Sequence, residues 1–303
     1  MVANLARGDS AFLIAVSMAS SAAPPVWYVY GIVPASLSPS TLPSGLDDAD
    51  VVIERRNGDR AAALVSVLDG ERYAEAPLES SSGDVNWLSP RAVAHDRVLT
   101  WASDLGPVVP FPMFSLFSGR EAVDAMLSER SAQLASLLDR LSIGREYALR
   151  VYRVDKELLD HVTELSPRLE QLAATAAAAA PGQRYLLERK LELEKKAELR
   201  VVTQKLVDEI IETLGEFAVQ LVRSPIPRTD NVAEARGVMV LNAAFFVEPA
   251  ALEPFQRALT SLVERHGAHG LRFDFTGPWP PYHFVGDAGG APSDQQRTPD
   301  HVG

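Results

Sequence analysis

The sequence contains no cysteine among its 303 residues. Disulfide bonds, thiolate metal ligands and cysteine nucleophiles are therefore excluded. Basic residues are also scarce: 29 Lys and Arg stand against 40 Asp and Glu, which leaves a formal net charge of -11. Nucleic-acid binding needs a basic face that contacts phosphates, so no DNA or RNA partner is expected.

Long hydrophobic runs are missing as well. No segment approaches the roughly 18 apolar residues of a membrane-spanning helix, so no membrane partner is expected. Residues 11–23 resemble the apolar part of a signal peptide, but Asp9 follows Arg7 and weakens the basic segment that should precede it. We interpret residues 1–25 as a disordered N-terminal extension or a misassigned start. A cleaved signal, and with it a secreted binding module, is the alternative.

The usual catalytic motifs are absent too. There is no G-x-x-x-x-G-K-[ST] loop, no G-x-G-x-x-G after a strand, no H-E-x-x-H and no G-x-S-x-G. His95 and Asp96 are adjacent on a predicted helix, where neighbouring side chains point about 100° apart and do not face each other. We expect no catalytic and no cofactor-binding residue. An enzyme on a similar core without a recognisable motif is the alternative.

The histidines form only weak metal-binding patterns. His266 and His269 are three residues apart but lie on either side of Gly267, where a helix is expected to stop. His161 and Glu164 share a helix face, and such a pair can supply two metal ligands. A solvated surface is the more common reason for both patterns, so the sequence predicts no metal ligand and no cofactor.

What the sequence does contain is ordinary globular material, since 47% of the residues are hydrophobic and 23% are charged. Its length favours two domains. The first, residues 26–118, is expected to be mostly strands. Strands are predicted at 26–33, 51–54 and 61–68, with a hairpin turn at Asn57-Gly58, and the Pro-containing segment 108–117 is predicted as an edge strand or extended chain. Ser89-Pro90 is expected to open a helix with an apolar stripe at Val93, Val98, Leu99, Ala102 and Leu105.

The second domain, residues 119–285, is expected to alternate helices and strands. Helices are predicted at 121–141, 155–180, 183–223 and 253–266, and strands at 147–154, 238–247 and from 271. The break at Pro181-Gly182 indicates a helical hairpin or a hinge. The long helix carries an apolar stripe from Leu199 through Leu206 and Ile210 to Leu221. Residues 286–303 are expected to be a disordered tail.

One segment near the C-terminus is unusual in composition. Three prolines alternate with aromatic residues in T-G-P-W-P-P-Y-H-F, residues 276–284. Prolines fix the backbone, and Trp and Tyr are favoured at protein interfaces, so Trp279 and Tyr282 are candidate partner-binding residues. A rigid strap that covers the end of the core is the alternative.

Six segments in order resemble those of one known family. They are Y-V-Y-G-I-V-P at 28–34, H-D-R-V-L at 95–99, the strand at 144–152, the charged helix start at 185–196, L-N-A-A-F-F-V at 241–247 and T-G-P-W-P-P-Y-H-F at 276–284. The chain thereby resembles the GvpL/GvpF gas vesicle protein family over about residues 26–285. The family usually has P-L-R-F-G-T-V-F after its first helix, whereas residues 110–117 here lack that Arg and that Gly.

The resemblance implies an α+β fold of two domains, the C-terminal one modified ferredoxin-like with a long charged helical insertion. It implies a non-enzymatic, cytoplasmic accessory protein associated with gas vesicles. Such a protein is expected to bind the small hydrophobic shell protein and other vesicle proteins during assembly. The candidate surfaces are then Trp279 and Tyr282, an open sheet edge, and the charged helix start with Arg184, Arg189 and Lys190.

Overall fold

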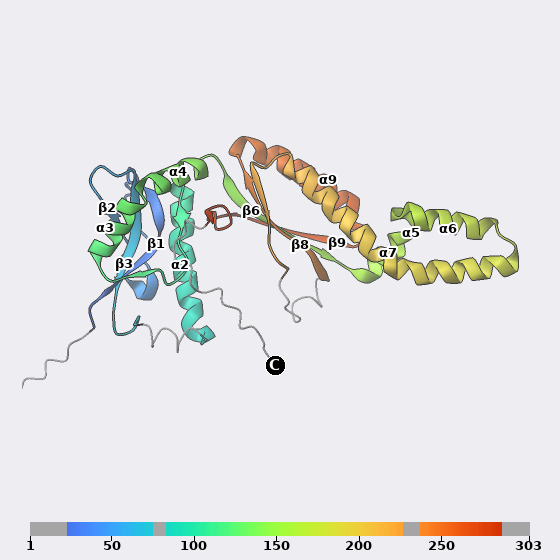
Figure 1. The fold of residues 1–303 in the computed structure, drawn as a ribbon, viewed down its shortest axis with the longest axis horizontal. Helices are drawn as coiled ribbons and strands as arrows, with labels where there is room; N and C mark the ends of the chain where they lie inside the picture. The colour runs from blue at the N-terminus through green and yellow to red at the C-terminus, as the bar shows by residue number, and fades with distance from the viewer. Residues whose placement is uncertain (1–22, 75–82, 227–236, 287–303) are drawn as a thin grey trace, which may run out of the picture.

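The computed structural model describes residues 23–74, 83–226 and 237–286. It is a mixed helix-and-sheet fold with two antiparallel sheets and a helical hairpin that projects away from the second sheet (Figure 1). Nearly all of the predicted N-terminal extension and C-terminal tail, and with them most of the signal-like segment, lie outside the described residues.

The first sheet has the strand order β2-β3-β1-β4, and β5 also pairs with β1. Its strands are β1 (Val26–Pro34), β2 (Val52–Arg55), β3 (Ala61–Leu68), β4 (Val109–Pro110) and β5 (Leu116–Phe117). The Asn57-Gly58 hairpin is confirmed: β2 and β3 pair antiparallel, and Gly58 has a φ of 87°, which glycine adopts without strain. The segment 108–117 is extended and contributes two short pairings to β1, as its prolines predict.

Helices cover both faces of this sheet (Figure 1). Helix α2 (Val85–Leu105) packs on the face that contains Tyr28 and Tyr30. It begins earlier than predicted, because Asp84 caps it by accepting a hydrogen bond from the Asn86 backbone N–H, and Pro90 lies inside it. The predicted stripe is partly wrong: Val93 and Leu105 are exposed, and the buried face is completed by Ala94 and His95.

Helices α3 (Arg120–Glu129) and α4 (Ser131–Leu141) cover the opposite face, which contains Val29 and Ile32. They replace the single helix expected over 121–141 and break at Arg130. The boundary expected between residues 118 and 119 assigns them to the second domain, whereas they pack on the first sheet. Their apolar stripes fit that sheet because its strands alternate side chains between two faces, and α2 covers only one of them.

The second sheet has the order β7-β8-β6-β9, and every neighbouring pair is antiparallel. Its strands are β6 (Arg145–Arg153), β7 (Gln220–Arg223), β8 (Val238–Val247) and β9 (Leu271–Trp279). Two helices, α9 (Leu252–Gly267) and the C-terminal half of α7 (Pro181–Gly215), pack on one face around Phe245 and Ile210. The short 3-10 turn η2 (Pro249–Ala251) leads into α9.

The long helix ends at Gly215 and not at Arg223 as predicted. Residues 220–223 instead form the edge strand β7, whose backbone pairs with residues 243–246 of β8. The hairpin prediction at Pro181 is confirmed: α5 (Asp155–Leu165) and α6 (Pro167–Ala178) replace one predicted helix, and α6 packs against α7. We call residues 167–198, which project from the sheet, the arm (Figure 1).

Candidate functional site

The described cleft nearest to the predicted aromatic residues lies where the two sheets meet, under the end of β9 and the residues that follow it. We call residues 276–286 the strap. Glu146, on β6, is 2% exposed, and both hydrogen bonds of its carboxylate are made with His283 of the strap. The His283 backbone N–H donates to its Oε2 (3.0 Å), and the ring Nδ1 of His283 lies 2.7 Å from its Oε1. This hydrogen bond raises the pKa of His283 above its ordinary value.

The backbone of β6 and β9 sets this contact. Glu146 pairs with Trp279 in the ladder, and the register shifts between Glu146 and Ala148. Gly277 has a φ of 125°, and a side chain there would lie 2.9 Å from the Glu146 carbonyl oxygen. Only glycine allows the strap to approach β6 this closely. The strap is therefore fitted to the sheet by its backbone as well as by its side chains.

The strap also joins the two halves of the molecule. Phe284 is buried, with its ring 5.2 Å from that of Phe246 on β8, and Phe284 belongs to the same apolar cluster as α3, α4 and the first sheet. Tyr282 donates its hydroxyl to Oδ1 of Asp96 on α2 (3.3 Å). Burial, together with the nearby Asp96 carboxylate, raises the pKa of Tyr282. The strap is thus held by residues of both halves.

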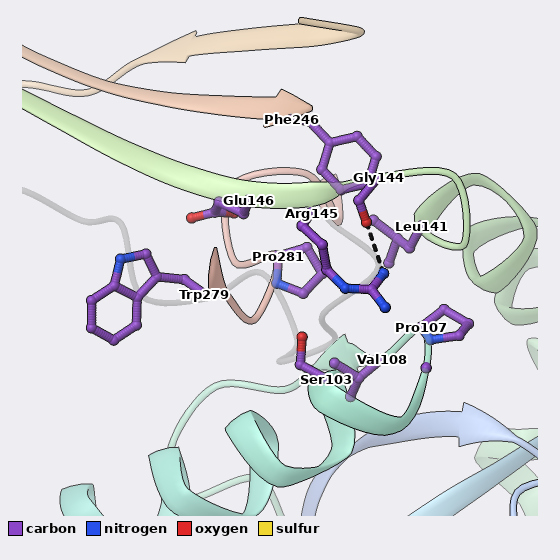
Figure 2. Close-up of a pocket in the computed structure, with 11 residues that line it drawn as sticks. Ser103, Pro107, Val108, Leu141, Gly144, Arg145, Glu146, Phe246, Trp279 and Pro281 are labelled. Atoms are coloured by element: carbon purple, nitrogen blue, oxygen red, sulfur yellow. Dashed lines mark hydrogen bonds between the residues drawn. The ribbon is translucent and has the colours of Figure 1, made fainter. Parts of the chain in front are cut away.

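Between the strap and the first half lies a narrow cleft (Figure 2). It is lined by the end of α2 and the residues after it, by Leu141, by residues 144–146, by Phe246, and by Trp279 and Pro281. Its volume of about 10 Å³ is the room that one water molecule occupies. Arg145, which points into it, donates to the Gly144 carbonyl oxygen at 3.0 Å. Such a cleft has no room for a small-molecule substrate.

The two predicted aromatic residues are both half-exposed on the strap. Trp279 is 38% exposed, and its Nε1–H donates to Oγ1 of Thr276 at 3.1 Å. Figure 2 shows its ring pointing away from the cleft. Tyr282 is 41% exposed despite its hydrogen bond to Asp96. Both side chains present aromatic surface to solvent while their polar atoms are held from within the protein.

The predicted basic residues lie elsewhere, on the arm. Arg184 donates from Nη2 to the carbonyl oxygens of Ala177 (3.1 Å) and Ala179 (3.3 Å), so it closes the hairpin turn. Lys190 is paired with Glu194 at 3.7 Å, and Arg189 is exposed. The structure therefore separates the basic set from Trp279 and Tyr282 and does not form one site from them (Figure 1).

The arm also carries exposed apolar residues that our sequence analysis did not select. Tyr185, Leu186 and Leu193 are 66–70% exposed on α7. Leu186 and Leu193 are seven residues apart and therefore share one side of the helix. The seven-residue spacing could have been found in the sequence, but the many charged residues around it favoured the interpretation of a solvated, charged helix.

His95 is a structural residue. Its Nδ1 and the Tyr28 hydroxyl share a hydrogen bond of 2.7 Å within the core, and its ring stacks against Tyr30. Burial lowers the pKa of His95 to about 4, so the ring is neutral at pH 7. Asp96 faces the strap, and the two residues do not interact as a catalytic pair, as predicted.

Metal-ligand side chains come together at a third place, the base of the arm. There His161, Glu164 and His269 have ligand atoms within 4.8 Å of one another. In the sequence, His161 with Glu164 and His269 with His266 stood out as two separate candidate pairs of metal ligands. The fold instead places His269 beside the first pair.

Among the described residues, no helix is long and apolar enough to cross a bilayer.

Comparison with known proteins extends over both halves. The family model described as "Gas vesicle synthesis protein GvpL/GvpF" matches residues 26–286. Gas vesicle protein L of Streptomyces sp. (strain CB03234) is 27% identical over 77% of this chain and 82% of its own. Gas vesicle protein F of the same strain is 28% identical over 85% of this chain and 98% of its own.

Two solved structures share the fold. The gas vesicle protein GvpF from Anabaena sp. PCC7120 aligns with a TM-score of 0.61 at 18% identity, over 86% of this chain and 96% of that chain. GvpF from Microcystis aeruginosa aligns with a TM-score of 0.59 at 20% identity, over 86% of this chain and 98% of that chain. Both alignments cover nearly the whole of the solved chains.

Proposed function

Because the chain belongs to the GvpL/GvpF family of gas vesicle synthesis proteins, we propose that it is a non-enzymatic accessory protein of gas vesicle assembly. In this role it binds the small hydrophobic shell protein and other gas vesicle proteins in the cytoplasm, in association with gas vesicles. The observation that carries the proposal is the family match over residues 26–286, which includes both halves and the strap.

We also propose that the second half is a modified ferredoxin-like domain. Its elements follow the order strand, helix, strand, strand, helix, strand, and its sheet has the order β7-β8-β6-β9. The arm is then an insertion between the first two of these strands. This arrangement supports a rigid platform with a long projecting binding element.

The partner surface that we propose is the strap, with Trp279 and Tyr282 as its main contacts. The shell protein is expected to be strongly apolar on one side, and exposure of that side to water is unfavourable by roughly 25 cal/mol per Å². Half-exposed aromatic rings whose polar atoms are already bonded lose little entropy on binding, which is typical of interface hot spots. Asp96, which accepts the hydroxyl of Tyr282, supplies a charged group at the edge of this surface. Arg184, Arg189 and Lys190 on the arm are the second proposed surface.

Co-purification with the shell protein tests the function, and two variants test the surface. The double variant Trp279→Ala/Tyr282→Ala is expected to retain much less shell protein than the wild type, while its thermal unfolding temperature falls only slightly. Val263→Ala removes an exposed apolar side chain from α9 and serves as the control, with unchanged binding. The reverse pattern, a large loss of stability with normal binding by the folded fraction, would assign both rings to the core.

The arm is tested in the same assay by Arg189→Glu/Lys190→Glu, which reverses two exposed charges without touching the strap. Loss of shell protein in this variant alone would move the contact surface from the strap to the arm. If the wild-type chain retains neither the shell protein nor any other gas vesicle protein, the proposed function is wrong.

A further inference from the structure

The base of the arm brings together three side chains of the types that bind transition metals. Helix α5 carries His161 and Glu164 three residues apart, so both project from one side of the helix. His269 lies in the turn between α9 and β9, at the other end of the domain in sequence. The ligand atoms of all three residues lie within 4.8 Å of one another.

One carboxylate oxygen is the centre of this group. Oε1 of Glu164 lies 2.6 Å from Nδ1 of His161 and 3.5 Å from Nε2 of His269. The two imidazole ring centroids are 5.2 Å apart. Ligand atoms that surround a zinc ion at about 2.0–2.2 Å in a tetrahedron are separated by about 3.3 Å. To hold the ion, His161 and Glu164 would separate by a fraction of an ångström, Glu164 and His269 are already near this distance, and the two histidine nitrogens, which lie within 4.8 Å of each other, would come to it as well.

The turn that carries His269 is fixed against α5 by its backbone. The Val154 N–H donates to the Gly270 carbonyl oxygen at 2.8 Å. Gly270 has a φ of 88°, and a side chain there would lie 2.7 Å from Cβ of Glu157 on α5. Two residues later, in β9, Arg272 donates from Nη2 to both carboxylate oxygens of Glu157 at 2.8 Å. These contacts hold His269 in place whether or not an ion is present.

The ring of His269 has polar atoms that the protein does not use. Its Nδ1 is buried and has no hydrogen-bond partner among the described residues. Its Nε2 lies 3.5 Å from Oε1 of Glu164, longer than an ordinary hydrogen bond. Nε2, which faces Glu164 across this gap, is therefore the ring nitrogen that is available to an ion, whereas Nδ1 is a separate buried atom that needs a partner of its own.

We propose that His161, Glu164 and His269 bind a divalent transition-metal ion, with Zn²⁺ as the best match. Two imidazoles and one carboxylate form the ligand set that zinc accepts, with water in the remaining position. Nitrogen ligands disfavour Mg²⁺ and Ca²⁺, which prefer oxygen. The bound ion links α5 to the α9–β9 turn and thereby braces the base of the arm. This proposal differs from the sequence-based expectation of no metal ligand.

The test uses the full chain, purified without a polyhistidine tag and freed of metal with a chelator. Calorimetric titration with Zn²⁺ is expected to show one ion per chain, and Co²⁺ is expected to give the visible absorption of a low-symmetry nitrogen–oxygen site. Zn²⁺ should raise the thermal unfolding temperature, because it binds only the folded protein. Loss of an outer partner of a metal ligand weakens metal binding by about 10–100-fold, so the ligand variant His161→Ala/His269→Ala should lose at least as much.

Two further variants make the result decisive. Asp160→Asn removes a neighbouring carboxylate from α5 outside the group and should bind Zn²⁺ as the wild type does. Glu164→Gln keeps the size of the side chain and should weaken binding even if the double histidine variant fails to fold. Wild-type binding below one ion per chain, or binding that is unchanged in Glu164→Gln and in the double variant, would overturn the proposal.

Discussion

Ile210 tests whether the C-terminal half of α7 is part of the core of the second half. The side chain is fully buried in the cluster that α7 forms with β8 and α9. Ile210→Ala removes three carbon atoms, each worth about 0.8 kcal/mol of transfer free energy, or about 2.4 kcal/mol in all. The cavity that remains adds to this loss, so we expect the free energy of unfolding to fall by about 3–4 kcal/mol.

Urea unfolding followed by far-ultraviolet circular dichroism measures this change, since α7 is the longest described helix. Leu193→Ala is the matched control. It removes a similar side chain from the same helix, but from the arm, where Leu193 is 70% exposed, and should cost less than about 0.5 kcal/mol. A loss for Ile210→Ala below about 0.5 kcal/mol, or no larger than that of the control, would refute the assignment of this half of α7 to the core.

Two further predictions concern pH. Glu198 at the base of the arm accepts hydrogen bonds from Ser166 and Arg168, and these lower its pKa below the usual 4.5. The contribution of the Glu198 carboxylate to folding stability is therefore present above pH 4.5 and is lost as the pH falls through its lowered pKa. Glu198→Gln should destabilise the protein by about 1 kcal/mol at pH 7 and by less at pH 3, as measured by urea unfolding. For His283 the pH dependence of stability runs in the opposite direction, because its pKa is raised. The bond between His283 and Glu146 contributes fully to stability below pH 6.5, and this contribution is lost as the pH rises through the raised pKa. The stability difference between wild type and His283→Gln should therefore be larger at pH 6 than at pH 9, and an equal difference would show that this bond does not hold the strap.

The location of the strap is compatible with both a stabilising role and the binding role that we propose for it. Phe284 is buried against Phe246, and His283 bonds to the buried Glu146, whereas the rings of Trp279 and Tyr282 remain half-exposed. The contacts with Phe246 and Glu146 hold the segment in place while its exposed rings present apolar surface. A rigid aromatic surface loses little entropy when a partner binds.

Local patterns determined several elements without help from the rest of the fold. The continuous apolar runs of β1 and β8 predicted buried strands, and both are central in their sheets. Asn57-Gly58 predicted a hairpin because both residues tolerate positive φ. The Pro181-Gly182 break predicted the hairpin of the arm. In each case, the short-range preference and the tertiary environment favour the same conformation.

The end of α7 shows where local patterns are insufficient. Phe217 and Leu221 continue the spacing of the apolar stripe, so periodicity alone extends the helix to Arg223. The structure ends it at Gly215, because residues 220–223 pair with the edge of β8. The backbone N–H and C=O groups of four residues can form their hydrogen bonds either within a helix or with a neighbouring strand. Only the presence of an unpaired strand edge nearby decides between the two.

The two side-chain groups on which our proposals rest are brought together by tertiary structure alone. Glu146 and His283 lie far apart in sequence, as do Glu164 and His269, and neither pair carries a spacing that predicts contact. The sequence did determine the residue types, and with them the absence of thiol chemistry and the aromatic character of the strap. Which of those residues meet depends on the strand order β7-β8-β6-β9, which places β9 beside β6. Because these two strands are antiparallel, the residues after β9 lie near the start of β6, and the residues before β9 lie near its end. Long-range pairing of strands has no local signal, because it is selected by the burial of whole faces and not by any one segment.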